Sequence, residues 1–288
     1  MEAFAASLIA VSGYSPKTAS NYRLYVGGFL RWWSEQGDLT GVGTADLQAY
    51  VAAEAHRGIA PATRQSIVNG LRAFFRYLHD HGHVETDPAE RLRGPRVPPP
   101  ATDIYRPGET DAILAHLAAL DDVRGRQRHA MLATLRYTGL RASELAHLPS
   151  AGLDLAARRA EVTGKGARHR VLVLPRPLAA VLAAHLAEVR PRLPDSAYVF
   201  ANPGARDPDA PYSLRSVYDE VVRAGEGARV AGRHHPHKWR HTFATELLRA
   251  DVDVHTVQRL LGHSNVSATV RYAHLADDDL RRRLDDVF

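Results

Sequence analysis

The stretch LDLAARRAEVTGKGARHRVLVL, residues 153–174, decides the fold class of this chain. Apolar and polar residues alternate on both sides of a Gly-Lys-Gly sequence, which predicts two strands joined by a tight turn. The surrounding patterns predict helices near residues 107–120, 125–138, 177–189, 213–224, 236–250, 253–261, 266–272 and 276–287. A small antiparallel sheet followed by many helices indicates an α+β fold that is mostly helical.

The lysine at the predicted turn, Lys165, is unusual for this chain. Only three of the 37 lysine and arginine residues are lysines, so a lysine kept here indicates a task that arginine does not perform. An ammonium group can release its proton near neutral pH, whereas a guanidinium effectively cannot. The flanking glycines allow a tight turn and leave the ammonium free to reach outward. A solvated turn lysine is the simpler alternative.

Upstream of the predicted strands, residues 137–145 read YTGLRASEL. Gly139 is expected to end one helix and Arg141 to begin the next. A cation at a helix start opposes the helix dipole, so helix stability does not explain Arg141. A phosphate at that end would suit both the arginine and the free N–H groups. Glu144 shares the same face and can hold the guanidinium, although an ordinary surface Arg–Glu pair is the alternative.

Downstream, residues 235–248 read HPHKWRHTFATELL. Pro236 can begin a helix, which places His237 and Arg240 one turn apart on a common face. His237 and His241 also have the spacing of a helical zinc pair. No acidic residue stands between them as a general base, and no third ligand is evident. The sequence therefore predicts no metal site.

Near the C-terminus, residues 260–274 read LLGHSNVSATVRYAH. His263 follows the glycine that closes an apolar run, and Tyr272 comes nine residues later. A tyrosine alone can simply pack its ring and hydrogen-bond its hydroxyl. The meaning of Tyr272 therefore depends on the partners that the rest of the chain supplies.

The first hundred residues indicate a separate helical bundle. Ser15 followed by Pro16 is typical of a capped helix start, and further helices begin at Thr44 and Pro61. A proline-rich stretch without helical periodicity comes next, as in a linker. The predicted organisation is a helical N-terminal domain at residues 1–93, a linker at 94–107 and a mixed C-terminal domain at 108–288.

Composition sets the outer limits. The 288 residues are 45% hydrophobic, which is enough for two cores, and they include no cysteine. No run of 18 apolar residues and no secretory signal is found, so the sequence predicts a cytoplasmic protein without a membrane partner. The net charge of +5 permits a polyanionic partner. Arg64, Arg72 and Arg76 lie on the helix from Pro61 and could meet phosphates, although solvated arginines are the simpler interpretation.

The motifs TGLRxSEL, a glycine-flanked hairpin lysine, HPHKxRHxFAT and LLGHSxxxxTxRYAH stand in this order. They closely resemble the motifs of the tyrosine recombinase (phage integrase) family, and of Xer-like site-specific recombinases in particular. The resemblance covers essentially the whole chain, including the helical N-terminal domain, and all four motifs in order are highly specific. It implies these catalytic residues: Arg141, Lys165, His237, Arg240, His263 and Tyr272.

The resemblance implies DNA strand cleavage by a tyrosine. Tyr272 would attack a phosphodiester of double-stranded DNA and form a 3′-phosphotyrosyl link with a free 5′-hydroxyl. Arg141 and Arg240 would neutralise the charge of the transition state, with His263 as a further donor. The covalent link conserves the bond energy, so another strand can reseal it without ATP.

Two proton transfers accompany this chemistry. The resemblance implies that His237 helps to accept the tyrosine proton and that Lys165 protonates the leaving 5′ oxygen. No metal or other cofactor is expected, because fixed cations take the metal's place. The family also implies self-association into a synaptic tetramer on DNA. Residues 275–288 place Leu280, Leu284 and either Val287 or Phe288 on one stripe of a predicted tail helix. The resemblance implies that this helix docks on a neighbouring protomer, and docking on its own protomer is the alternative.

Three other interpretations make different predictions. A metal-dependent nuclease would lose activity on chelation and leave a free cut end, and a DNA-binding regulator would form no covalent adduct. A type IB topoisomerase would relax supercoils as a monomer without a defined site. The two-domain size and the short C-terminus favour a recombinase, and the sequence is compatible with chromosome-dimer resolution and with integration or excision of a mobile element.

Overall fold

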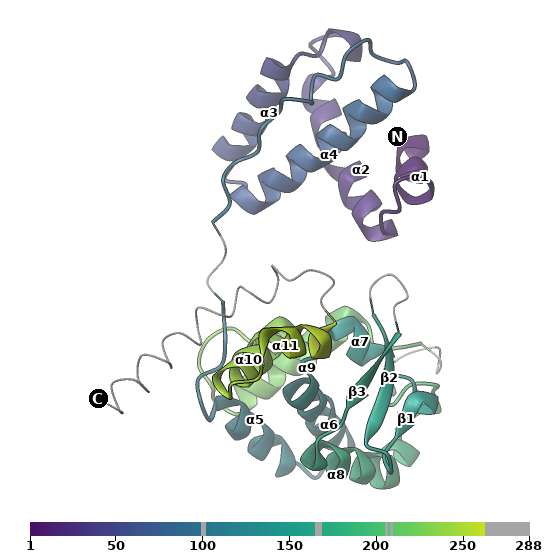
Figure 1. Cartoon of the computed structure of the whole chain (residues 1–288), viewed down its shortest axis with the longest axis vertical. Helices are drawn as coiled ribbons and strands as arrows, with labels where there is room; N and C mark the ends of the chain where they lie inside the picture. Colours follow the sequence, from purple (N-terminus) through teal and green to yellow (C-terminus); the bar gives the residue numbers. More distant parts are fainter. Residues whose placement is uncertain (99–101, 165–168, 205–206, 208–209, 263–288) are drawn as a thin grey trace, which may run out of the picture. The chain divides into compact units, whose positions relative to one another are not determined.

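The computed structural model describes residues 1–98, 102–164, 169–204, 207 and 210–262. The chain divides into two compact units, Met1–Pro100 and Ala101–Phe288 (Figure 1). The helices predicted at 266–272 and 276–287, including the tail helix, lie outside the described residues. No helix in the described part of the chain is long and apolar enough to cross a membrane.

The first unit is a bundle of helices, as predicted, with one that the sequence pattern did not indicate. The oxygen of Ser15 caps the second helix by accepting from the N–H of Thr18 at 3.1 Å, and Pro16 takes the first helical position. The additional helix, α1, has the sequence EAFAASLIA, which is apolar almost all round and so shows no clear stripe. The helices of this unit are α1 (Glu2–Ala10), α2 (Pro16–Trp33), α3 (Thr44–His56) and α4 (Pro61–Asp80).

Aromatic side chains form the centre of this first core. Phe29 is fully buried, stacks on Trp33 and meets Tyr50 and Phe75 edge-on, at ring distances of 6.3, 5.4 and 5.8 Å. These offset and edge-on geometries are the ones that aromatic quadrupoles favour. The bundle therefore has a core of its own, independent of the second unit.

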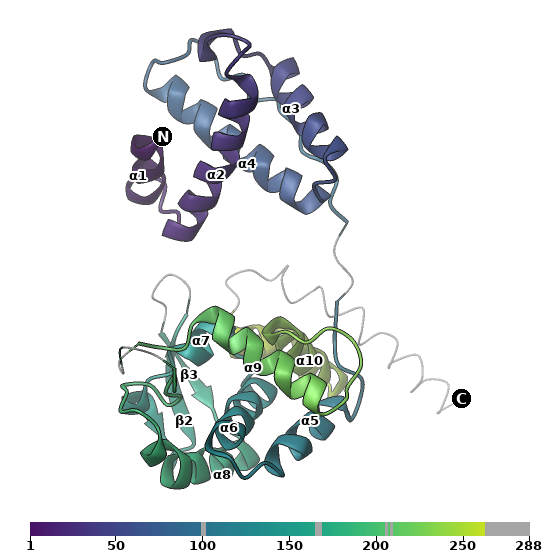
Figure 2. The same cartoon turned by 180° about the vertical axis from the view of Figure 1, so that it is seen from behind.

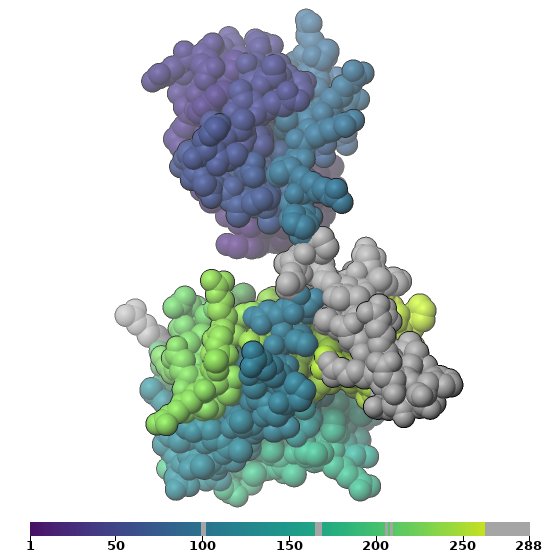
Figure 3. All heavy atoms as spheres, turned by 90° about the vertical axis from the view of Figure 1, so that its left-hand side faces the viewer, coloured from purple at the N-terminus to yellow at the C-terminus, as the bar shows by residue number. Residues whose placement is uncertain are grey.

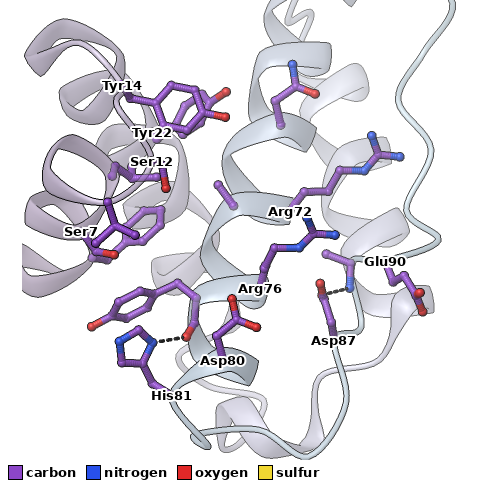
Figure 4. A pocket seen from close by; sticks show the side chains of 17 residues that line it. Ser7, Ser12, Tyr14, Tyr22, Arg72, Arg76, Asp80, His81, Asp87 and Glu90 are labelled. Atoms are coloured by element: carbon purple, nitrogen blue, oxygen red, sulfur yellow. Dashed lines mark hydrogen bonds between the residues drawn. The ribbon is translucent and has the colours of Figure 1, made fainter.

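A hollow of about 990 Å³ opens on this unit between α1, α4 and residues 87–90 (Figure 4). Arg72 and Arg76 extend from α4 on one side of it, and acidic side chains such as Asp87 and Glu90 share it. Arg72 donates to the carbonyl of Leu92. The guanidinium of Arg72 therefore fastens the chain after α4, which is a structural task that the sequence pattern does not reveal.

The second unit combines a small sheet with a larger group of helices (Figures 1 and 2). Its helices are α5 (Glu109–Ala118), α6 (Val123–Thr138), α7 (Ala142–Ala146), α8 (Arg176–Ala184), α9 (Leu214–Gly227), α10 (Pro236–Arg249) and α11 (Val254–Leu261), and a π-helical turn, His185–Val189, extends α8. Helix α6 lies in the middle, in contact with α5, α8 and α10, and its residues 130–135 are almost completely buried.

The sheet consists of β1 (Leu153–Asp154), β2 (Arg159–Thr163) and β3 (His169–Val173), all antiparallel and in this order. Its inner face buries Ala160, Val162 and Leu172, and its outer face exposes alternate residues, as expected for a sheet that faces water on one side. The predicted hairpin and the mostly helical α+β fold are confirmed. The turn with Lys165 lies outside the described residues.

Gly139 ends α6 where the sequence predicts and allows a close approach. It has a left-handed backbone with φ of 60°, and an added Cβ would lie 2.4 Å from the Phe243 ring and 2.9 Å from the Leu261 side chain. Both the backbone and the space therefore require glycine. The close approach brings α6, α10 and α11 together at one point.

We expect Gly139→Ala to destabilise the second unit through both effects. Gly108→Ala is the matched control, because Gly108 also has a positive φ, of 85°, but nothing within 4 Å of an added Cβ. Left-handed strain costs about 1–2 kcal/mol at either position, and the overlap at Gly139 should add about 1–3 kcal/mol. Urea denaturation measures the difference, and equal losses for the two variants would contradict the close packing at Gly139.

Candidate active site

Arg141 lies at the start of α7, as the sequence predicts, and is held there by Glu144. One oxygen of the Glu144 carboxylate accepts from the backbone N–H of Arg141 at 2.9 Å, and the other accepts from the guanidinium, also at 2.9 Å. Glu144 is only 3% exposed. The pair is therefore not an ordinary surface pair, and the carboxylate fixes both the backbone and the side chain of Arg141.

A second arginine, Arg170 of β3, meets the same carboxylate from the other side. Its two terminal nitrogens donate to the two oxygens of Glu144 at 2.7 and 3.0 Å, in the fork geometry that arginine and carboxylate share. None of the sequence motifs includes Arg170. A signal was present, because Arg170 occupies an inward position of β3, in register with buried Leu172.

The carboxylate of Glu144 stays ionised in this position. Burial by itself raises its pKa, but the hydrogen bonds and charges of Arg170 and Arg141 outweigh the burial, so the pKa of Glu144 lies below its usual 4.5. The negative charge therefore balances part of the positive charge of two arginines. Enough positive charge remains to attract an anion.

Arg240 of α10 is buried, at 3% exposure, and joins the ends of two other helices. Its guanidinium donates to the backbone carbonyl of Gly139 after α6 and to that of Leu261, the last residue of α11, at 2.7 Å each. Carbonyls at helix C-termini carry partial negative charge, which suits a cation. Two backbone carbonyls thus hold the side chain in place.

His237 lies one turn before Arg240 on the first turn of α10 and is exposed. Nearby protein atoms shield part of its ring from water, which lowers the pKa of His237, and the charges of Arg240, His235 and Arg141 lower it further. The geometry agrees, because Arg240 follows His237 by one turn of α10 and donates to the carbonyl of Gly139, two residues before Arg141. The structure therefore brings Arg141, His237 and Arg240 together, as the sequence motifs predict.

Three further candidates, Lys165, His263 and Tyr272, lie outside the described residues. Described residues stand close in sequence to two of these candidates. Lys165 falls between the end of β2 at Thr163 and the start of β3 at His169, and His263 comes directly after Gly262, which follows α11. An added Cβ at Gly262 would lie 2.8 Å from the guanidinium of Arg170. The segment that leads to His263 therefore starts against the arginine pair at Glu144.

The described side chains suit the binding of a phosphate diester. Two fixed guanidiniums offer positive charge and several N–H donors, which stabilise negative charge on phosphate oxygens, and the imidazole of His237 stands beside them. Within residues that the structure describes, no group of three or more histidine, aspartate or glutamate side chains is arranged to hold a metal ion. The pair His237 and His241, with ring centres 6.3 Å apart, has no third ligand there.

We expect Glu144→Gln to lower the free energy of unfolding of the second unit by about 3 kcal/mol, because removing one partner of a buried ion pair leaves the other charges uncompensated. Glu188→Gln is the matched control, since Glu188 pairs with Arg126 on the surface, where a salt bridge contributes at most about 1 kcal/mol. Urea denaturation at pH 7 measures both changes.

The pH dependence of this difference follows from the lowered pKa of Glu144. A lowered pKa in the folded state contributes stability above the unfolded value near 4.5, and that contribution is lost as the pH falls through the folded value. The gap between the native protein and Glu144→Gln should therefore shrink in acid below pH 4.5. A gap that is constant from pH 7 into this acid range would show that the Glu144 charge does not stabilise the fold.

Comparison with known proteins identifies the family of the chain. Residues 106–279 match the model of the phage integrase family, and residues 1–82 match its N-terminal SAM-like domain. The tyrosine recombinase XerC of Xylella fastidiosa (strain M23) is 32% identical over 96% of this chain and 92% of that protein. The XerC of Lactobacillus delbrueckii subsp. bulgaricus (strain ATCC BAA-365 / Lb-18) is 30% identical, over 96% of this chain and 94% of that protein.

Solved structures share the fold. The XerH site-specific recombinase in its post-cleavage complex with difH superposes with a TM-score of 0.79 at 19% identity, over 92% of this chain and 78% of XerH. A lambda integrase dimer bound to a core site superposes with a TM-score of 0.71 at 16% identity, over 93% and 96% of the two chains. With the motifs, the arginine cluster and these relatives in agreement, the chain belongs to the phage integrase family of tyrosine recombinases, enzymes that cut and rejoin DNA at specific sites.

Proposed function

We propose that six residues carry out this strand exchange: Arg141, Lys165, His237, Arg240, His263 and Tyr272. The observation that supports the proposal most directly is the cluster of Arg141, His237 and Arg240, in which one arginine is held by a buried carboxylate and the other by two helix-end carbonyls. Such fixed cations need no rearrangement when charge develops during the reaction, which is how preorganised sites accelerate reactions.

In the proposed reaction the phenolic oxygen of Tyr272 attacks the phosphorus of a DNA phosphodiester. A bond forms between that oxygen and phosphorus, and the bond from phosphorus to the 5′ oxygen breaks. Arg141, Arg240 and His263 bind the non-bridging oxygens, whose negative charge grows in the transition state. The product is a 3′-phosphotyrosyl link, which a 5′-hydroxyl from another strand attacks to reverse the steps and join new ends.

Protons move at both oxygens. The lowered pKa of His237 keeps its imidazole neutral at pH 7, so the ring can accept the proton that Tyr272 releases. Lys165 donates a proton to the leaving 5′ oxygen, which is a poor leaving group without one. A lysine suits this task better than an arginine because its ammonium can release the proton.

The partner in this reaction is double-stranded DNA, and the proposed working form is a tetramer that holds two DNA sites. A lambda integrase tetramer bound to a Holliday junction superposes on this chain with a TM-score of 0.71 at 16% identity. That likeness is of the fold, and the assembly is carried over here as a proposal. The tail at 275–288, with its apolar stripe, is the segment proposed to connect neighbouring protomers.

The role of Lys165 can be tested with a DNA substrate whose bridging 5′ oxygen is replaced by sulfur, because a thiolate leaves readily without an acid. We expect Lys165→Ala and Lys165→Arg to slow cleavage of the oxygen substrate by about 10²–10⁴-fold, the usual contribution of a general acid. Both variants should cleave the sulfur substrate at close to the native rate. The covalent protein–DNA adduct formed in a single turnover is the quantity to measure.

Tyr272→Phe is the control for the nucleophile and should form no adduct with either substrate. If Tyr272→Phe formed the adduct, the proposed mechanism would be wrong. If the Lys165 variants stayed equally slow on sulfur, the lysine would bind phosphate or support the structure, and the acid would have to be another residue, with His237 the next candidate.

A further inference from the structure

The chain segment that opens the second unit lies across the start of α10, the helix that carries His237 and Arg240. Asp103 is the contact point: one of its carboxylate oxygens lies 3.2 Å from the ammonium of Lys238, and the other lies 3.2 Å from Nε2 of His235. Figure 3 shows this segment at the surface of the second unit, next to the helices of the C-terminal half. A carboxylate from outside α10 is therefore bonded to two residues of its first turn.

Lys238 is the buried partner in this contact, at 5% exposure. Besides Asp103, its ammonium donates to the carbonyl of Arg233 at 3.2 Å and lies 4.5 Å from the centre of the Tyr105 ring, within the range of a cation–π interaction. An added Cβ at Gly232 would lie 3.7 Å from the same nitrogen. The enclosure fits a compact ammonium, which explains a lysine here in a chain that otherwise uses arginine.

His235 is the cap of α10 and depends on the same carboxylate. Its Nδ1 accepts from the backbone N–H of Lys238 at 3.1 Å, so the ring proton is on Nε2 and points to Asp103. A hydrogen bond at one ring nitrogen fixes which form the other nitrogen takes. Asp103 therefore holds the capping ring in the orientation and tautomer that the helix start needs.

Tyr105 extends the contact along α10 by one more turn. Its backbone N–H donates to the hydroxyl of Thr242 at 2.9 Å, and its phenol bonds Nδ1 of His234 at 3.0 Å. Its ring also packs on Trp239 at 5.1 Å. Residues 102–105, which the sequence assigns to the predicted linker, are thus attached to α10 by an ion pair, a cap and a buried aromatic contact.

His237 stands between the two residues that Asp103 holds, His235 and Lys238. In the described part of the chain its ring makes no hydrogen bond, so its direction depends on the backbone of the first turn. Arg240 is different, because the carbonyls of Gly139 and Leu261 hold its guanidinium directly. A loosened first turn would therefore displace His237 while Arg240 kept its partners.

We propose that Asp103 is a positioning residue for His237: it fixes the first turn of α10 through His235 and Lys238, and so directs the imidazole toward the reacting phosphate. This inference rests on the proposed function of His237 in accepting the tyrosine proton. Misplacement of a reacting group by about 1 Å can lower a rate by about 10²-fold. Asp103 itself touches neither DNA nor Tyr272 in this proposal.

The test is a double-mutant cycle with the full-length protein, in which the rate of adduct formation is measured at saturating DNA. We expect Asp103→Ala to slow adduct formation by about 10- to 100-fold in the native background. In the His237→Ala background, the same substitution should have no further effect, because the imidazole that it positions is absent. Asp103→Ala leaves the buried Lys238 ammonium without its carboxylate, so some loss of stability is expected. Thermal unfolding and half-site binding set the temperature and DNA concentration at which every variant is folded and bound, and the rates are compared there.

Glu109→Gln is the matched control, since the Glu109 carboxylate lies in the same part of the chain but accepts from Arg106 before α5 instead of contacting α10. It should leave the rate unchanged, and Tyr272→Phe defines the background. If Asp103→Ala is as fast as the native protein, or if it slows the His237→Ala variant by the same factor, the positioning role is wrong and the proposed function stands. If His237→Ala itself keeps the native rate, His237 does not accept the tyrosine proton, and the positioning role of Asp103 is then wrong as well.

Discussion

The candidate active site depends on the ion pairs that the buried carboxylate of Glu144 forms with two arginines. Charges taken out of water cost free energy, and the cost is recovered only when each has a partner of good geometry. Glu144 meets this condition for Arg141 and Arg170 together, with four hydrogen bonds from the two residues. Because Arg170 also packs against Gly262, one carboxylate connects α7, the sheet and the end of α11.

Much of this architecture could be predicted from local sequence pattern. Some signals act over only a few residues: proline at a helix start, glycine at a helix end and alternation in a strand. These signals predict α2, α6, α10 and the β2–β3 hairpin. The clustering of Arg141, His237 and Arg240 followed from their motifs. In contrast, α1 is apolar on nearly all sides, and no periodic pattern distinguishes it.

The supporting contacts could not be predicted in the same way, because they join residues that are far apart in the chain. Asp103 meets Lys238 and Tyr105 meets His234 across about half of the sequence, and neither pair has a spacing that a local rule can detect. Composition indicated some of the residues with special surroundings. The rarity of lysine singled out Lys165, and the same argument applies to Lys238, whose enclosed ammonium the structure shows.

The way in which Arg141 and Arg240 are held has a consequence for how the enzyme responds to its surroundings. Guanidinium groups keep their charge at any pH at which proteins are folded. The carboxylate that faces Arg141 has a lowered pKa, and the two backbone carbonyls that accept from Arg240 do not titrate. The charges of the two guanidiniums and of Glu144 are therefore constant across the physiological pH range, and a change of rate with pH in that range would report other groups, such as the histidines.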